Sequence, residues 1–426
     1  MESKTPNQTA IDELAARMPP GRLLYRIGPA RAPERGDWSA LVKAALENPI
    51  GTPPVSQLVR HGNKVVIIAD DLTRPTPQDK ILPPLLNALN AAGVPDSDIT
   101  VLIALGTHRY MTGPEMRTRF GDEVCERVNV VNHLWKDPST TVDLGLSLRG
   151  TPVKVNRLAY EADFLIGTGS IVPHIYAGWG GGAKIVMPGI SNAESVAPTH
   201  ALAAEDGSLL GVAGRAGNTC RREMERVAAR ARLKFILNVV TDAFGTPAWV
   251  GAGDPVEAHR AGIKAAEQVF LRPIPRLADI LIADAQPADL DYWQGIKALA
   301  HVQPGLKGGG TVILLAEFPD GISPTHTEFR DHALKSAEEI LRDREAGEIA
   351  DSAIVTTLCL HAEILARCKV ICVSSFMSPQ DKVRLGFLHV ESAEEALAVA
   401  FAQQGAEAAV GIIEYAGDLL PRLTSR

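Results

Sequence analysis

The segment from His174 to His200 carries the densest set of side chains that could do chemistry. Four glycines lie within five positions of it, at 178, 180, 181 and 182, and they let the backbone adopt positive φ and approach a ligand closely. Lys184 follows them. Its amine could act as a nucleophile once desolvation lowers its pKa, or its ammonium could bind a phosphate or a carboxylate. A Walker A loop is excluded, because Ala183 and Ile185 replace the glycine and the Ser/Thr that it requires.

Two further loops place polar side chains directly after strand-like runs. Asp71, Thr73 and Arg74 follow the run 64–70, where they could capture an anion, or Asp71 and Arg74 could form an ion pair that closes a turn. His108 follows the run 99–105 and could be an acid or base, or a structural histidine. His174, His200 and His108 have no zinc-type spacing, although a single histidine ligand is still allowed.

The C-terminal part of the chain offers one more polar pair. Gln294 and Lys297 lie three residues apart on one face of a predicted helix, where they could hold a carboxylate together or belong to a solvated face. The charged segment 220–232 is predicted to be an exposed helix with intrahelical ion pairs. Four other residues suggest a zinc site, but two of them bracket a run typical of a buried strand, and we favour the strand: Cys359, His361, Cys368 and Cys372.

The elements that must position these residues indicate an α/β fold. Strand-like runs at 64–70, 99–105 and 162–169 alternate with helical patterns such as 79–93. Each run is hydrophobic almost throughout, which predicts a parallel or mixed sheet covered by helices on both faces. Ligands are then expected beyond the carboxyl ends of the strands.

The length of 426 residues favours two domains over one. Two prolines in the segment 271–278 mark a junction, so we predict an N-terminal α/β domain over 1–272 that binds the cofactor and a C-terminal α/β domain over 273–426 that contributes substrate-binding residues. The active site is expected in a cleft between them. The second domain is predicted to hold further strands and a helix, at 278–285, 309–318, 369–375 and 291–301.

The composition limits the classes of partner. A formal net charge of −7 argues against binding to nucleic acid or an anionic membrane, which leaves a small molecule as the expected partner. The polar N-terminus lacks the apolar core of a signal peptide, and no apolar run is long enough to span a bilayer, so a cytoplasmic location is predicted. Five irregularly spaced cysteines are expected to be reduced thiols.

Five motifs, taken in order, resemble those of the nickel-pincer-nucleotide-dependent lactate racemases and related 2-hydroxyacid racemases and epimerases. They are DDLTRPTP at 70–77, GTHR at 106–109, VPHIYAGWGGGAKIVMPG at 172–189, PTH at 198–200 and YWQGIKAL at 292–299. The resemblance implies a pyridinium mononucleotide with two sulfur-containing arms that bind nickel, made by dedicated cofactor-assembly enzymes.

The resemblance also implies a role for individual residues. Lys184 matches the lysine joined covalently to the cofactor, and His200 matches the nickel ligand. His108 and His174 match the acid/base pair. The remaining matches are the cofactor-binding loop and the substrate-binding positions: Asp71, Leu72, Thr73 and Arg74 for the loop, and Arg74, Gln294 and Lys297 for the substrate.

The implied reaction avoids a difficult step. Removing the α-proton of a 2-hydroxy acid is unfavourable because the adjacent carboxylate is already negative, whereas proton-coupled hydride transfer to the cofactor gives a planar 2-keto acid that accepts hydride on either face. Two alternatives stay open: a binding protein without turnover, and a metal-independent epimerase with two histidine bases. The substrate is not defined by the sequence, and the expected pocket lining beyond the named residues is Tyr292, Trp293 and His301.

Overall fold

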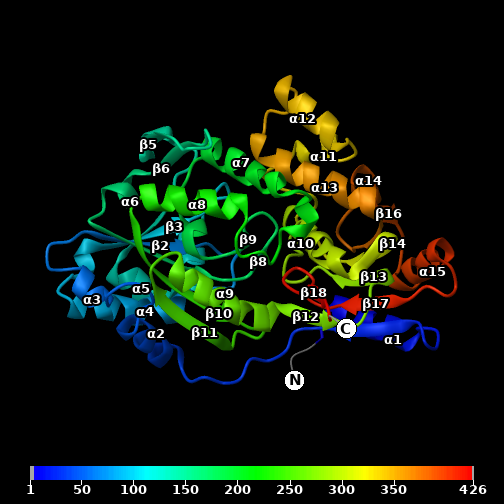
Figure 1. The fold of residues 1–426 in the computed structure, drawn as a ribbon, viewed down its shortest axis with the longest axis horizontal. Coiled ribbons are helices and arrows are strands. Elements are labelled where there is room, and N and C mark those ends of the chain that lie inside the picture. The colour runs from blue at the N-terminus through cyan, green and yellow to red at the C-terminus, as the bar shows by residue number, and fades with distance from the viewer. Residues whose placement is uncertain (1–3, 425–426) are drawn as a thin grey trace.

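The structure is a computed structural model that describes residues 4–424, so residues 1–3 and 425–426 of the two predicted domains lie outside it. Two six-stranded sheets, each with helices packed on it, dominate the chain (Figure 1). The predicted α/β class is therefore confirmed. No helix of the described residues is long and apolar enough to cross a bilayer.

The first sheet contains the strands that precede the predicted catalytic loops. Its spatial order is β11-β10-β7-β2-β3-β4, and every neighbouring pair is parallel except β10 and β11. The predicted strands at 64–70, 99–105 and 162–169 are confirmed as β2, β3 and β7. The bounds are β2 Val65–Asp70, β3 Ile99–Ala104, β4 Asn129–Asn132, β7 Phe164–Ser170, β10 Leu233–Thr241 and β11 Pro247–Gly253.

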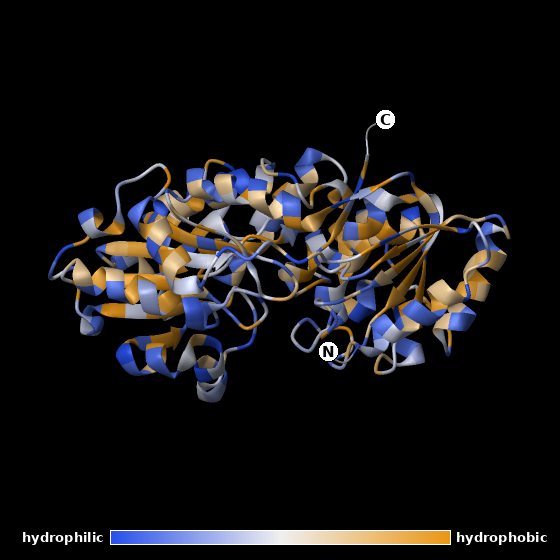
Figure 2. Cartoon of the chain, turned by 90° about the horizontal axis from the view of Figure 1, so that it is seen from below, coloured by the Kyte–Doolittle hydropathy of each residue, from blue (hydrophilic) through white to orange (hydrophobic). Residues whose placement is uncertain are grey.

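Helices cover both faces of this sheet, as the hydrophobic runs predicted. Successive residues of β2, such as Ile67 and Ile68, belong to different hydrophobic clusters, because successive side chains of a strand point to opposite faces. Figure 2 shows the apolar strands of both sheets between helices with polar outer surfaces. The principal helices are α2 Trp38–Glu47, α4 Gln78–Ala91 and α5 Gly113–Arg127 on one face, and α8 Thr219–Arg230 and α9 Glu257–Phe270 on the other.

The second sheet is parallel throughout, in the order β1-β17-β13-β14-β15-β16. The predicted strands at 278–285, 309–318 and 369–375 are confirmed as β13, β14 and β15. The bounds are β1 Leu23–Ile27, β13 Ala278–Asp284, β14 Leu306–Leu315, β15 Lys369–Val373, β16 Leu388–His389 and β17 Val410–Ile413.

One strand of this sheet comes from the beginning of the chain. β1 pairs with β17, and α1 (Pro6–Ala16) buries Ile11 and Leu14 against the same sheet. The predicted division at residue 272 grouped this segment with the first sheet, and the strand pairing assigns it to the second instead. Further helices on the second sheet are α10 Tyr292–Val302, α13 Val355–Arg367 and α15 Ala393–Gln404.

The proline-containing segment predicted as a domain junction forms a strand. β12 (Leu271–Ile274) pairs in parallel with β18 (Leu420–Leu423), which forms a separate two-stranded sheet. The chain therefore passes from the first large sheet to the second through β12, a strand that pairs with β18 near the C-terminus of the protein.

Candidate active site

A cavity of about 420 Å³ collects the predicted site residues. Loops that follow β2, β3 and β7 form one part of its wall, and residues 287–297 form another. All ten side chains singled out in the sequence line it: Asp71, Leu72, Thr73, Arg74, His108, His174, Lys184, His200, Gln294 and Lys297. Parallel strands bring their carboxyl ends to one edge of a sheet, so residues distant in sequence meet there.

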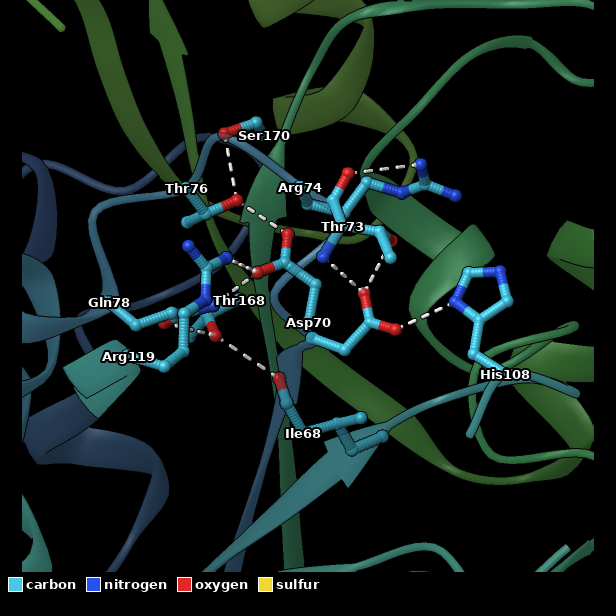
Figure 3. Close-up of polar contacts among 11 residues, drawn as sticks. Ile68, Asp70, Thr73, Arg74, Thr76, Gln78, His108, Arg119, Thr168 and Ser170 are labelled. Carbon is cyan, nitrogen blue, oxygen red and sulfur yellow. Dashed lines mark hydrogen bonds and ion pairs between the residues drawn. The ribbon is translucent and has the colours of Figure 1, made fainter. Parts of the chain in front are cut away.

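The loop after β2 is anchored by the hydrogen bonds of Asp70, the last residue of that strand (Figure 3). The buried Asp70 carboxylate accepts hydrogen bonds from Thr76 Oγ1 at 2.5 Å and Gln78 Nε2 at 2.9 Å, and it pairs with Arg119 at 2.7 Å. Thr76 also contacts Ser170 Oγ on β7 at 2.8 Å. The loop between residues 71 and 75 is therefore held at both of its ends.

Asp71 orients His108. One carboxylate oxygen accepts a hydrogen bond from His108 Nδ1 at 2.7 Å, and the other accepts from Thr73 Oγ1 at 2.6 Å and Thr73 N at 3.1 Å (Figure 3). Burial would raise the pKa of Asp71, but the charge and hydrogen bond of His108, with help from Arg74, lower it well below its usual range. The predicted alternative of an Asp71–Arg74 ion pair is wrong, since Asp71 binds His108 and Thr73.

Arg74 and Lys297, two of the three basic residues that line the cavity, have no carboxylate within ion-pair distance among the described residues. Arg74 makes only a long 3.5 Å hydrogen bond to the carbonyl of Thr73. Lys297 Nζ donates to Gln294 Oε1 at 2.5 Å. Burial and then the charge of Arg74 lower the pKa of Lys297, while Asp418 opposes that shift. Asp418 also lines the cavity, and sequence reasoning missed it although it lies shortly after a strand.

His174 is held by its own backbone. It ends the short strand β8 (Pro173–His174), and its Nδ1 accepts hydrogen bonds from the amides of Tyr176 at 3.2 Å and Ala177 at 3.1 Å. These donors assign the proton of the neutral ring to Nε2. Burial, followed by the charges of Lys184 and Arg74, lowers the pKa of His174 well below its usual value.

Lys184 lies in the short 3-10 helix Gly182–Ile185, directly after the glycine-rich loop. The loop needs glycine at position 178, where φ is +73° and a Cβ atom would lie 1.8 Å from the carbonyl oxygen of Arg215. The amine of Lys184 makes no hydrogen bond within the described chain. Burial, then Arg74 and Lys297, lower its pKa well below the usual value, which favours the neutral, nucleophilic amine.

His200 lies in the last turn of α7 (Ala193–Ala201). Its Nε2 is buried and has no hydrogen-bond partner in the described structure. Its ring centroid lies 4.9 Å from that of Tyr176 and 6.3 Å from that of His174. Burial and then Lys184 lower the pKa of His200 to about 3, so the ring is neutral at neutral pH.

Comparison with known proteins identifies the family. Residues 11–211 match the family model described as the lactate racemase N-terminal domain. The lactate racemase of Lactiplantibacillus plantarum is 31% identical over 392 residues, which cover 87% of this chain and 88% of that protein. The chain belongs to the lactate racemase family. This lactate racemase homologue is therefore an isomerase of the racemase type.

Solved structures agree with this assignment. The lactate racemase apoprotein from Thermoanaerobacterium thermosaccharolyticum has a TM-score of 0.83 and 28% identity, covering 95% of this chain and 96% of that one. A protein from Thermotoga maritima has a TM-score of 0.73 at 20% identity, covering 92% and 100% of the two chains, and this likeness concerns the fold alone. The family fold thus extends over both sheets.

In this lactate racemase homologue, the segment 220–232 forms a helix as predicted, α8, but the prediction that this helix is exposed is wrong. Within α8, Arg221 is 0% exposed and donates hydrogen bonds to carbonyls of the glycine-rich loop. The spacing of apolar residues in α8 could have indicated this burial. Arg221 lies three residues before the buried Met224 and seven before Ala228, which places it on the apolar stripe of the helix. The charge-rich composition concealed this stripe.

Two of the three expected pocket-lining residues lie elsewhere. Tyr292 is fully buried among aromatic rings, and His301 is buried with Nδ1 against the carbonyl of Ala416, so neither lines the cavity. Trp293 does line it and stacks on His326 at 4.2 Å between centroids. The expectation for Tyr292 is wrong because helix α10 presents this side chain to the hydrophobic core.

The cysteine-rich C-terminal segment has structural contacts. His361 uses both ring nitrogens, at 2.7 Å from Tyr292 Oη and 3.1 Å from the carbonyl of Leu385. Cys372 lies inside β15, as the favoured strand interpretation predicted. Across the described residues, no group of three or more His, Cys, Asp or Glu side chains could hold a metal ion.

Proposed function

We propose that this protein racemises lactate or a closely related 2-hydroxy acid with a nickel-pincer nucleotide joined to Lys184. The observation that carries the proposal is the meeting of His108, His174, Lys184 and His200 in one cavity with Arg74 and Lys297. In this proposal, residues 1–272 bind the cofactor and residues 273–426 supply Gln294 and Lys297. The cofactor-assembly enzymes are the expected partners.

The residues of the cavity fit this cofactor. A neutral lysine amine without hydrogen bonds can condense with a thiocarboxylic acid arm to give a thioamide, with loss of water, and Lys184 has this neutral character. The neutral, unpartnered Nε2 of His200 is the form of histidine that binds metals, and the shortage of other protein ligands suits a metal held by the arms of a cofactor. When bound, the group would supply a hydride acceptor for the substrate.

His108 is suited to take the hydroxyl proton. The ionised Asp71 fixes the histidine proton on Nδ1, which leaves the lone pair on Nε2 free to act as a base. Asp71 also stabilises the imidazolium that forms when Nε2 gains the proton, as the carboxylate of a catalytic triad does. This arrangement supports His108 as a general base.

His174 has the opposite proton arrangement. With Nδ1 occupied by the amides of Tyr176 and Ala177, its neutral ring can donate a hydrogen bond, without losing the proton, from Nε2 to the oxygen on C2 of the substrate. To accept a proton at Nε2, the ring must first give up these two amide contacts. We therefore propose that His174 changes tautomer during racemisation, whereas His108 keeps Nδ1 on Asp71.

The cations orient the substrate. Arg74 and Lys297 lack carboxylate partners, so both can bind the carboxylate of the substrate while the hydroxyl group moves between the histidines. Gln294 holds the ammonium of Lys297 in place. Asp71, Leu72 and Thr73 form the loop proposed to contact the cofactor.

Single enantiomers of lactate and of larger 2-hydroxy acids, incubated with the protein coproduced with the cofactor-assembly enzymes, test the activity. We expect loss of optical purity from either enantiomer, at a rate that falls when nickel and cofactor are removed. Full activity after that removal would instead favour a metal-independent epimerase with two bases. Binding of the acids without any loss of optical purity would favour a binding protein.

A further inference from the structure

Arg221 makes an unusual set of contacts beneath the glycine-rich loop. Its side chain is 0% exposed, and its guanidinium donates from Nε to Ala177 O at 3.3 Å, from one terminal nitrogen to Gly181 O at 3.0 Å, and from the other to Trp179 O. No carboxylate lies within ion-pair distance of it in the described structure. One buried cation thus binds three alternate carbonyls of a single loop.

A buried guanidinium without a carboxylate partner is costly, because its desolvation is offset only by neutral carbonyls. Only an arginine offers rigid, forked donors that reach three acceptors at once. A neutral donor could satisfy one of these carbonyls at a smaller desolvation cost. The buried charge can therefore act on neighbouring ionisable groups while the guanidinium closes the loop.

Neighbouring elements complete the hold on the loop. The Nε2 of His259 on α9 lies 2.7 Å from the carbonyl of Gly180, and Asn238 Oδ1 accepts the amide of Gly182 at 2.8 Å. The carbonyl of Gly178 accepts from the amide of Gly214 at 2.9 Å. Every carbonyl from 177 to 181 is therefore bound, and Lys184 follows this fixed segment at once.

We propose that Arg221 is a positioning residue for Lys184, holding the loop from which the lysine enters the cavity and placing a positive charge behind it. This inference rests on the proposed function for its purpose, since a fixed, neutral amine is what covalent attachment needs. The charge of Arg221 acts with burial, Arg74 and Lys297 to lower the pKa of Lys184. Neither Arg74 nor Lys297 contacts the loop carbonyls.

Competitive acetylation of the full-length apoprotein, quantified by peptide mass spectrometry between pH 6 and 11, tests the inference without the cofactor. The rate at Lys184 is divided by the rate at the exposed Lys264 in the same sample. In Arg221→Met, we expect the midpoint of the Lys184 profile to rise by about one pH unit, which lowers the relative rate at pH 7 about tenfold. Arg221→Gln should behave in the same way, and Arg221→Lys should restore the midpoint.

Arg222→Met provides the matched control, because Arg222 is the next residue of α8 and is exposed. It should leave the Lys184 profile unchanged. Coproduction with the assembly enzymes adds a second readout: Arg221→Met should carry at least about fivefold less adduct on Lys184 than wild type. A folded Arg221→Met or Arg221→Gln variant with the wild-type midpoint would overturn the inference. An active wild-type enzyme without an adduct would refute the proposed tether. The labelling profile of the apoprotein would still test whether Arg221 lowers the pKa of Lys184.

Discussion

Asp71 and His108 form the most directly interpretable contact of the cavity. The 2.7 Å hydrogen bond assigns the proton to Nδ1 and leaves the lone pair on Nε2, the base of the proposed reaction. Burial raises the pKa of Asp71, but His108 and Arg74 lower it by more, so the carboxylate stays ionised even far below neutral pH. The function of His108 therefore depends on a second residue that never needs to touch the substrate hydroxyl.

Asp71→Asn should lower kcat by about 100-fold or more, because the amide cannot both fix the Nδ1 proton and stabilise the imidazolium. Steady-state racemisation of lactate, measured by polarimetry, gives the value. Asp79→Asn, which changes an exposed acid just beyond the same loop, is the control and should keep kcat. Racemisation by Asp71→Asn within threefold of wild type would refute the role assigned to this carboxylate.

Residue types and spacing located these side chains in the sequence, but not their partners. His108 stands shortly after one strand-like run, and the glycines and Lys184 lie in the segment that follows another, which is a local signal. The pairing of Asp71 with His108 instead depends on how β2 and β3 lie side by side in the sheet. The alternative of a local Asp71–Arg74 pair was chemically reasonable and failed for this reason.

Among the elements, the loop before Lys184 is the most tightly constrained. Gly178 has a positive φ, and its α-hydrogen side faces the carbonyl of Arg215. The loop is bound to α8, α9 and β10 through Arg221, His259 and Asn238. Small changes in this element should therefore affect both folding and the position of Lys184.

Gly178→Ala should destabilise the protein by more than about 2 kcal/mol, because the new Cβ meets a backbone oxygen at 1.8 Å and the positive φ becomes strained. Urea unfolding followed by circular dichroism measures the change. Gly217→Ala is the matched control, since no atom lies within 4 Å of its Cβ, and it should change stability by about 0.5 kcal/mol or less. Equal stability of the two variants would contradict the geometry described for the loop.

Elements with continuous apolar runs could be predicted, whereas those marked by charge could not. The strands β2, β3, β7, β13 and β15 are buried on both faces, and this leaves a clear local pattern. Helix α8 carries a similar apolar stripe, but its arginines and glutamates indicated a solvent-exposed helix. A buried arginine that binds carbonyls has no compositional signature of its own.

At the scale of the whole molecule, strand order depends on contacts that no local pattern records. β1 joins the sheet formed by the C-terminal residues, and β12 pairs with β18 near the end of the chain. The division near residue 272 was inferred from two prolines, which mark a boundary but not the sheet to which the N-terminal segment belongs. Parallel pairing between distant strands requires the tertiary structure.

Buried neutral histidines make stability depend on pH. Burial lowers the pKa of His133 and His361 to about 4 and those of His200 and His301 to about 3, against about 6.5 in the unfolded chain. Between these values the unfolded state binds more protons, so unfolding becomes easier as pH falls from about 6.5 towards 4.

The melting temperature of the apoprotein should therefore fall between pH 7 and pH 5, with up to about 1.4 kcal/mol lost per pH unit for each histidine. Four buried aspartates act in the opposite sense, because burial raises the pKa of Asp284 and Asp418 to about 6 and also raises those of Asp289 and Asp291. They are outnumbered by six buried histidines with lowered pKa values, since His174 and His259 are shifted in the same direction as the four named above. Thermal scans at pH 7, 6 and 5 measure the trend, and His133→Gln should flatten it. A melting temperature that is constant or rises towards pH 5 would count against this account.

The central claim is that racemisation depends on a cofactor joined to Lys184, and intact-protein mass spectrometry combined with a racemisation assay tests it most directly. Protein coproduced with the assembly enzymes should carry an adduct in wild type and in His108→Ala. Wild type alone of these two should racemise lactate, and Lys184→Ala should lose both adduct and activity. Active wild-type enzyme with an unmodified Lys184, or an active Lys184→Ala variant, would contradict the claim.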